Sequence, residues 1–236
     1  DALNGLYQAT RLTDDRHGTD YSQRFLNYLH EVQDQDLTLG VAMTDAKGDR
    51  SKRPGLQANP DVYVHIKERR PDGIVIRGTK AIVTGAPYMH EFLVMPCRTH
   101  VPADKDFAVC CAVPIDAPGV TIVARPAGRP GDASAKFSAK YGQSVGVVIF
   151  DDVFVPHERV FLAGETEEGG FLTTSYATHH RHSCIGARAG FGDLLIGAGA
   201  LMIEANGLDA EKHAHIREAM VELITITESF YACGVA

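Results

Sequence analysis

The chain changes its hydrophobic period once, near Gly164, and this change constrains the fold more than any other feature. Between residues 62 and 162, short apolar runs alternate with Pro, Gly and Asp. This pattern is typical of short β-strands joined by turns. Residues 170–205 instead form a long segment of helical character, rich in Gly and Ala. Strands without intervening helices favour a small antiparallel barrel or sandwich, so the chain is predicted to be an α+β protein.

The individual elements follow from local patterns. Apolar residues at helical spacing predict a helix over 20–35, and the next apolar run predicts a strand over 37–43. The turn sequence Arg70-Pro71-Asp72-Gly73 separates strands expected at 62–66 and 73–77. Asn206-Gly207 predicts the end of the long helix, and Asp209 is expected to cap the next one. Further strands are predicted at 81–84, 91–95, 107–113, 119–124, 146–150 and 159–162.

Composition narrows the possible functions. The 236 residues are 44% hydrophobic and carry a net charge of −7, without a long basic tract, which argues against nucleic-acid binding. No uninterrupted apolar run reaches the roughly 20 residues that span a bilayer, so no membrane partner is expected. Five irregularly spaced cysteines indicate reduced thiols in a cytoplasmic protein, with Cys110 and Cys111 as core residues. Both ends look cut, so we expect an internal segment of a longer protein.

A run of basic and nucleophilic residues occupies positions 179–193. If this run is helical, one face presents His180, Cys184, Ala187 and Arg188. Burying such a face is costly unless polar or anionic groups lie against it. Two interpretations remain: a face paired with acidic residues of a neighbouring helix, or a surface that contacts a cofactor or substrate.

Two loops at strand ends are candidates for cofactor binding. Residues 44–50 alone could be a solvated hairpin loop, and residues 84–87 alone an ordinary turn. Together they offer hydroxyl and backbone donors that could hold an anionic, heteroaromatic cofactor. The glycine pairs at 190–192 and 197–199 lie inside the helical pattern, so they are interpreted as packing residues and not as a phosphate-binding motif.

The motifs at residues 43–50, 72–81, 150–156 and 180–183 resemble those of the flavin-dependent 4-hydroxyphenylacetate 3-hydroxylase and 4-hydroxybutyryl-CoA dehydratase family. The resemblance covers essentially the whole chain. It implies an acyl-CoA-dehydrogenase-like fold: the end of an N-terminal helical domain (1–36), a flavin-binding middle antiparallel β-barrel (37–168) and the first helices of a C-terminal bundle (169–236). It also implies a homo-oligomer, a flavin reductase as a possible partner, and FAD bound by Met43, Thr44, Asp45, Lys47, Arg50, Val83, Thr84 and Gly85.

The resemblance places His180 beside the flavin, and this sequence departs from the family pattern around it. In the dehydratase this histidine ligates an iron–sulfur cluster together with a cysteine whose position is Ala187 here. The dehydratase's tyrosine, lysine and glutamate fall on Cys184, Arg188 and Val145, and the hydroxylases' catalytic histidine falls on Val41. Because a methyl group cannot ligate iron, no metal is expected, although Cys184 is a conceivable substitute ligand.

The expected catalytic residues are therefore His180, Cys184 and Arg188. The expected function is FAD-dependent oxidoreductase chemistry, of hydroxylase or dehydrogenase type, on a small acyl-CoA or phenolic substrate. The alternatives are a dehydratase/isomerase homologue with altered ligands and a catalytically inactive structural subunit.

Overall fold

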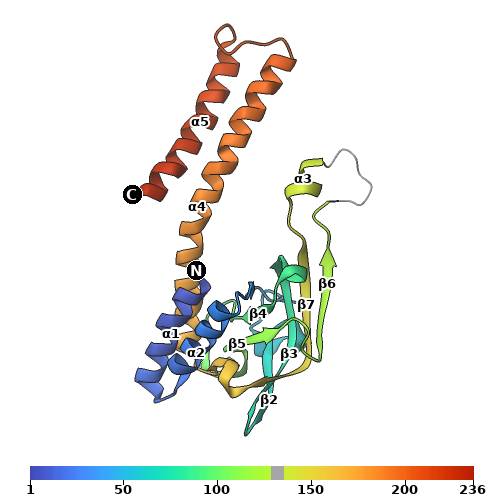
Figure 1. The fold of residues 1–236 in the computed structure, drawn as a ribbon, viewed down its shortest axis with the longest axis vertical. Helices are drawn as coiled ribbons and strands as arrows, with labels where there is room; N and C mark the ends of the chain where they lie inside the picture. Colours follow the sequence, from blue (N-terminus) through green and yellow to red (C-terminus); the bar gives the residue numbers. More distant parts are fainter. Residues whose placement is uncertain (129–135) are drawn as a thin grey trace. The chain divides into compact units, whose positions relative to one another are not determined.

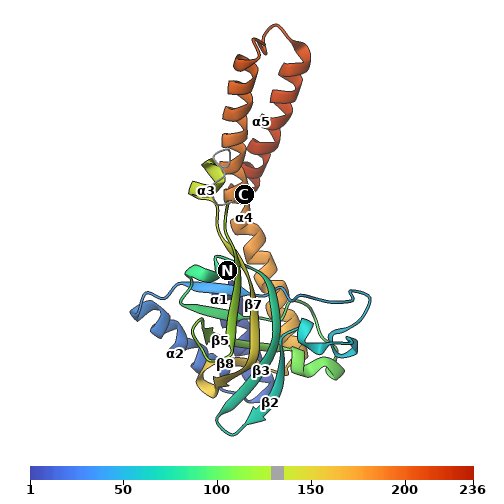
Figure 2. The same cartoon turned by 90° about the vertical axis from the view of Figure 1, so that its right-hand side faces the viewer.

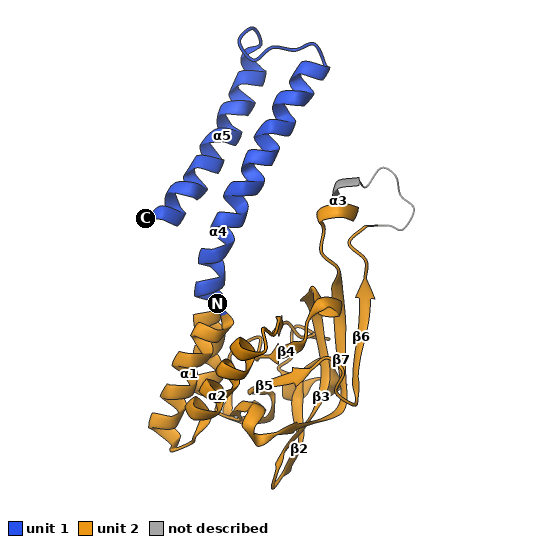
Figure 3. Cartoon of the chain, viewed as in Figure 1, with its two compact units in different colours: residues 1, 177–236 blue, residues 2–176 orange. Residues whose placement is uncertain are grey.

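The computed structural model describes residues 1–128 and 136–236. The chain divides into two compact units, which Figure 3 shows in different colours. The larger unit comprises residues 2–176, and the smaller comprises residues 177–236 together with Asp1.

Two helices open the larger unit, α1 (Ala2–His17) and α2 (Tyr21–Asp34). The sequence predicted this second helix, and the helical spacing of its buried residues Tyr21, Phe25, Tyr28 and Val32 places them on one face. Asp14 secures the connection between the helices, because its carboxylate accepts hydrogen bonds from the backbone N–H groups that begin α2.

In the described part of the chain, eight strands form two four-stranded sheets (Figures 1 and 2). The first has the order β1 (Leu39–Ala42), β4 (Glu91–Val94), β5 (Val109–Pro114), β8 (Val160–Ala163). The second has the order β2 (His65–Arg70), β3 (Gly73–Thr84), β7 (Val145–Pro156), β6 (Val120–Arg125). Short helical turns and α3 (Lys136–Tyr141) lie in the connections between successive strands along the chain. The α+β class is confirmed, but the barrel is not, because the strands pair as two sheets and β1 runs parallel to β4.

The first sheet is buried on both faces, and alternation along β4 and β5 explains how. Phe92 and Val94 join the core shared with the second sheet, whereas Leu93 and Met95 join the core beneath α1 and α2. Successive side chains of a strand point to opposite faces, so a continuous apolar run can serve two cores. Cys110 and Cys111 divide in the same way and are fully buried, as expected.

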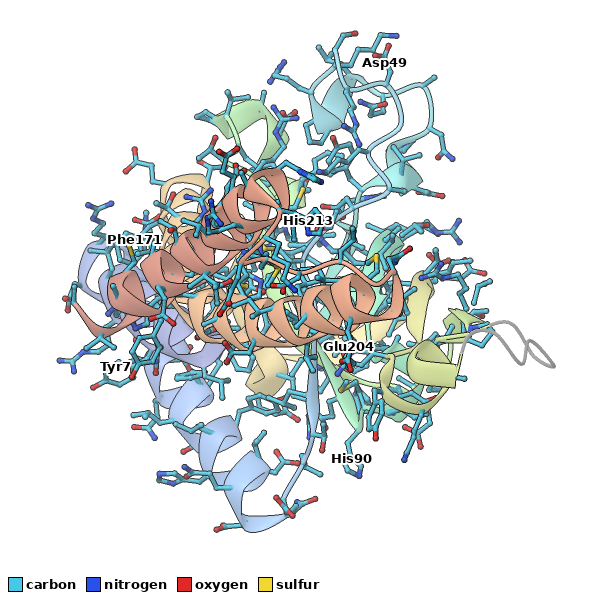
Figure 4. All side chains as sticks on the ribbon, turned by 90° about the horizontal axis from the view of Figure 1, so that it is seen from above. Tyr7, Asp49, His90, Phe171, Glu204 and His213 are labelled. Atoms are coloured by element: carbon cyan, nitrogen blue, oxygen red, sulfur yellow. The ribbon has the colours of Figure 1, made fainter. Side chains whose placement is uncertain are left out.

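The smaller unit is built from most of α4 (Thr166–Ala205) and from α5 (Ala214–Val235). Gly192 and Gly199 let the helices approach closely, because an added Cβ would press against Thr227 and Met220 respectively. Gly207, at a φ of 65°, follows the end of α4 as predicted. The predicted cap at Asp209 is wrong: α5 begins later, at Ala214, and the Asp209 carboxylate accepts from a backbone N–H of the preceding turn. Figure 4 labels Glu204 in the last turn of α4 and His213 just before α5.

By length and composition alone, α4 could cross a membrane, and it is the one such helix among the described residues. Counting uninterrupted apolar residues missed it, because Arg188 and Asp193 interrupt its apolar segment. Core helices of soluble proteins pass the same test. The absence of a membrane partner therefore stays a prediction.

We expect residues 1–236, produced alone, to self-associate. Leu194, Leu201, Met202 and Val221 are each more than half exposed on α4 and α5, so association would remove apolar surface from water. Light scattering after size-exclusion chromatography should detect species larger than a monomer, and replacing Leu201 and Met202 by Gln should reduce them. A monodisperse monomer that unfolds cooperatively would contradict this expectation.

Candidate functional site

The loop at residues 43–50 is held against β3 by backbone hydrogen bonds. The Ala81 N–H donates to the Thr44 carbonyl (2.7 Å), and the Ala46 N–H donates to the Thr79 carbonyl (3.2 Å). Lys47 adopts a φ of 74°, which turns the chain sharply before Gly48. Asp49, labelled in Figure 4, lies further along the exposed part of this loop. The first half of the loop is thus fixed in position, and the second half faces solvent.

A buried ion pair lies beneath the loop. Lys80 Nζ is 2.8 Å from Asp45 Oδ1, and the two side chains are only 2% and 4% exposed. The ammonium also donates to the carbonyls of Met43 (2.8 Å) and Met95 (2.7 Å), while Asp45 accepts from the Val64 N–H (2.9 Å). Both charges are therefore compensated inside the protein, as a buried pair requires. The Asp45 carboxylate is already engaged there and does not face solvent.

A cavity of about 340 Å³ lies beside this loop. Three cationic side chains contribute to its wall, Lys47, Arg50 and Arg98, and none of them has a carboxylate within ion-pair distance among the described residues. Uncompensated cations around a concave site attract anions. The remaining lining residues are Tyr63, Cys97 and Thr99. Sequence analysis identified Lys47 and Arg50 but missed Arg98, because no local motif marks it.

Two titratable groups near the cavity are held neutral by burial. Burial lowers the pKa of His100 to about 4. Burial also raises the pKa of the Cys97 thiol, and the nearby negative charge of Asp45 raises it further. His100 Nδ1 is buried without a hydrogen-bond partner among the described residues. An orphaned polar atom of this kind is costly. The neighbourhood therefore retains unused hydrogen-bonding capacity.

The second predicted loop lies at the end of β3. Thr84 is exposed, whereas Val83 is buried in the core between the sheets. Gly85 adopts a φ of 72°, and its N–H donates to the Ser144 carbonyl (2.8 Å). In the β3–β7 ladder Thr84 pairs with Val145, the position that the resemblance assigns to a glutamate. Thr44 and Thr84 thus both offer exposed hydroxyls, and Met43 packs partly against the helix-side core.

The predicted helix face of His180, Cys184, Ala187 and Arg188, called the α4 stripe below, lies on α4 in the smaller unit. Cys184 Sγ is 3.6 Å from His180 Nε2, and His180 Nδ1 is 3.6 Å from Asp1 Oδ2. Cys184, Ala187 and Arg188 share a cavity of about 460 Å³ with apolar residues of α4 and α5: Phe191, Leu195, Leu223, Ile226 and Phe230. Within the described residues, no three His, Cys, Asp or Glu side chains are grouped so as to hold a metal ion.

The fold identifies the broad structural class of the protein, and the sequence then identifies its family. A glutaryl-coenzyme A dehydrogenase structure superposes with a TM-score of 0.61 at 16% identity, over 97% of this chain and 54% of that one, which shows a shared acyl-CoA-dehydrogenase-like fold. Residues 1–162 match the 4-hydroxyphenylacetate 3-hydroxylase N-terminal family, and residues 170–236 match the C-terminal family of the same name. The chain belongs to the 4-hydroxyphenylacetate 3-hydroxylase family, as the motifs predicted.

The chain is similar to enzymes of both kinds within this family. A 4-hydroxybutyryl-CoA dehydratase/vinylacetyl-CoA-Δ-isomerase of Clostridium aminobutyricum is 38% identical over 100% of this chain and 49% of its own length. A 4-hydroxyphenylacetate 3-monooxygenase oxygenase component of Thermus thermophilus is 30% identical over 98% and 48%. The chain thus spans about half the length of the curated relatives it matches.

Solved structures of both kinds of enzyme superpose on this chain. An archaeal 4-hydroxybutyryl-CoA dehydratase from N. maritimus superposes with a TM-score of 0.90 at 37% identity, covering 100% of this chain and 47% of that one. A 4-hydroxyphenylacetate 3-monooxygenase oxygenase component complexed with FAD superposes at 0.83 with 29% identity, over 98% and 48%.

Replacing Lys80 by Met should lower the free energy of unfolding by about 3–5 kcal/mol, because Asp45 would remain buried without its partner. Amide hydrogen exchange of Ala46 and Ala81 should accelerate, since the loop would lose its anchor. Lys52→Met is the matched control: this lysine pairs with Asp49 at the surface and is half exposed, so its loss should cost less than about 1 kcal/mol. Equal effects of the two substitutions would contradict the anchoring role of Lys80.

Proposed function

We propose that the full-length protein is an FAD-dependent oxidoreductase that acts on a small acyl-CoA or phenolic substrate. The observation that carries the proposal is the cationic cavity beside the 43–50 loop, the loop that the family resemblance assigns to FAD. Family membership supports the same function, since a relative with this fold is complexed with FAD.

The residues around the loop fit an FAD molecule. Lys47 and Arg50 would pair with its phosphates, because charge-assisted hydrogen bonds to phosphate oxygens are strong. Thr44 and Thr84, both exposed, would donate hydroxyl hydrogen bonds. The buried Asp45, Val83 and Gly85 would contribute through the backbone positions they hold, and Met43 through its carbonyl, which Lys80 fixes. Bound FAD would supply hydride transfer, and hydroxylation when its reduced form meets oxygen.

The α4 stripe supplies candidate proton-transfer and anion-binding groups. His180 would exchange a proton at Nε2, because Nδ1 faces the Asp1 carboxylate. Arg188 stays cationic and would bind an anionic group of the substrate. Cys184 would be the third catalytic residue, because it contacts His180 and lines the same cavity as Arg188.

We further propose that this protein lacks the iron–sulfur cluster of the dehydratases. Ala187 stands where the resemblance assigns a cysteine ligand, and such clusters normally take four protein ligands. Val145 likewise stands where a glutamate would move a proton, and a valine side chain cannot do so. These two replacements favour flavin chemistry without iron.

A dehydratase/isomerase homologue with altered ligands is the second candidate. The 38% identity over the whole chain to the dehydratase of Clostridium aminobutyricum favours it. Iron content separates the two candidates, and a missing flavin would instead indicate an inactive structural subunit.

The organisation of the whole protein is proposed on the same basis. We assign residues 1–36 to the end of a helical domain, 37–168 to the flavin-binding domain and 169–236 to the start of a bundle. The exposed apolar residues of α4 and α5 support a homo-oligomer, a homotetramer in our proposal. A cytoplasmic location and, for a hydroxylase, a partner flavin reductase complete the proposal.

Purified full-length protein should bind FAD non-covalently, and Arg50→Ala should weaken this binding by about 1.5–3 kcal/mol, since one charge-assisted contact is lost. Flavin absorbance and fluorescence titration measure the effect. Lys52→Ala, two residues beyond Arg50 and outside the cavity, should bind FAD normally. A protein that neither contains flavin nor takes up added FAD would contradict the proposal.

Anaerobically purified protein should contain flavin without stoichiometric iron, and His180→Ala should abolish turnover while flavin is retained. Elemental analysis and flavin spectra give the first result. His182→Ala, on the same helix and exposed, is the matched control and should stay active. About four irons and four sulfides per subunit would overturn the iron-free assignment, and an active His180→Ala protein would remove His180 from the mechanism.

A further inference from the structure

Four side chains in the smaller unit, those of Cys184, His180, Asp1 and Ser183, form a continuous chain of polar contacts. Cys184 Sγ lies 3.6 Å from His180 Nε2, within reach of an S–H···N hydrogen bond. His180 Nδ1 lies 3.6 Å from Asp1 Oδ2, and Ser183 Oγ donates to Asp1 Oδ1 at 2.8 Å, which orients the carboxylate. A thiol next to an imidazole that is in turn positioned by a carboxylate is the general pattern of an activated nucleophile.

We propose that Cys184 is a nucleophilic thiol, that His180 is its base, and that Asp1 is the positioning residue for His180. This inference goes beyond the proposed flavin chemistry and does not depend on it, because the three groups lie together within one unit of the chain.

The cavity beside Cys184 defines the class of electrophile. Its wall is apolar except for Cys184, Thr227 and Arg188, and Arg188 supplies a cation. Phe191, Leu195, Ile226 and Phe230 would surround an apolar body. The site therefore suits a conjugated carbonyl compound that has an apolar body and an anionic group.

The step is balanced without an added oxidant or reductant. His180 Nε2 takes the proton from Cys184, and the thiolate forms an S–C bond at the β-carbon of the conjugated carbonyl. The π electrons move to the carbonyl oxygen as an enolate. The imidazolium then returns the proton to the α-carbon, and Asp1 stabilises the imidazolium in between.

The test is the alkylation rate of individual cysteines in the full-length protein, followed by peptide mass spectrometry with N-ethylmaleimide as the conjugated probe. Cys233 on α5 is the internal control: it is exposed, and no histidine lies at hydrogen-bond distance from it among the described residues. Cys184 is less exposed, yet it should react about tenfold faster, because the thiolate is the reactive form. In concentrated denaturant the two rates should become equal.

Substitutions separate the three roles. His180→Gln should slow Cys184 to the rate of Cys233. Asp1→Asn should slow it partly and Asp1→Glu should restore it, a rescue that a merely structural role would not show. Arg188→Gln should slow the reaction with iodoacetate more than the reaction with uncharged iodoacetamide, because only the former carries the anion that the arginine attracts.

Specific results would overturn the inference. Cys184 reacting no faster than Cys233 in the native protein would exclude an activated thiol. Protection that a chelator removes would show that the thiol ligates a metal instead. None of these measurements requires FAD, so a protein without flavin but with a fast Cys184 would reject the proposed function and keep this inference.

Discussion

The ion pair between Lys80 and Asp45 connects the two sheets at the point where the candidate cofactor loop begins. Lys80 belongs to β3 in the second sheet, while the carbonyls it binds, those of Met43 and Met95, follow β1 and β4 in the first. A buried charge is tolerated only when its hydrogen-bonding capacity is met, so these segments must stay together for the ammonium to remain buried. The position of Thr44 and Lys47 follows from this requirement.

The first sheet is subject to a second constraint, because it is buried on both faces. Residues of β4 and β5 serve the helix-side core and the sheet-side core alternately, so a shift of register by one residue would exchange the two cores. Tyr28, Arg159 and Glu91 add a polar link between α2 and this sheet: the buried Glu91 accepts from Tyr28 (2.9 Å) and pairs with Arg159 (2.7 Å). This packing gives the loops at the strand ends a rigid support.

The two candidate sites follow different physical logic. Around the loop, three cations that have no carboxylate partner within residues 1–128 and 136–236 line a cavity, and neutral Cys97 and His100 lie nearby, which suits the binding of an anion. On α4, by contrast, His180 is linked to Asp1 and to Cys184, which suits the movement of a proton. One interpretation of the stripe was a helix face paired with acidic residues of a neighbouring helix. His180 does lie 3.6 Å from a carboxylate, that of Asp1, but Asp1 precedes α1 and is not part of a helix.

The sequence by itself determined the α+β class, α2, the turn between β2 and β3 and the end of α4, because each depends on local periodicity and turn residues. The first strand of that hairpin was predicted at 62–66 but lies at His65–Arg70, where charged residues hide the strand pattern. Only the tertiary structure decided which polar residues become buried. Separate strands were predicted at 73–77 and 81–84, but β3 runs without a break from Gly73 to Thr84. Within it, Asp45, 35 positions away in the sequence, compensates the charge of the buried Lys80. Arg98 and Asp1 likewise gain their roles from contacts between distant residues, which periodicity and local motifs do not encode.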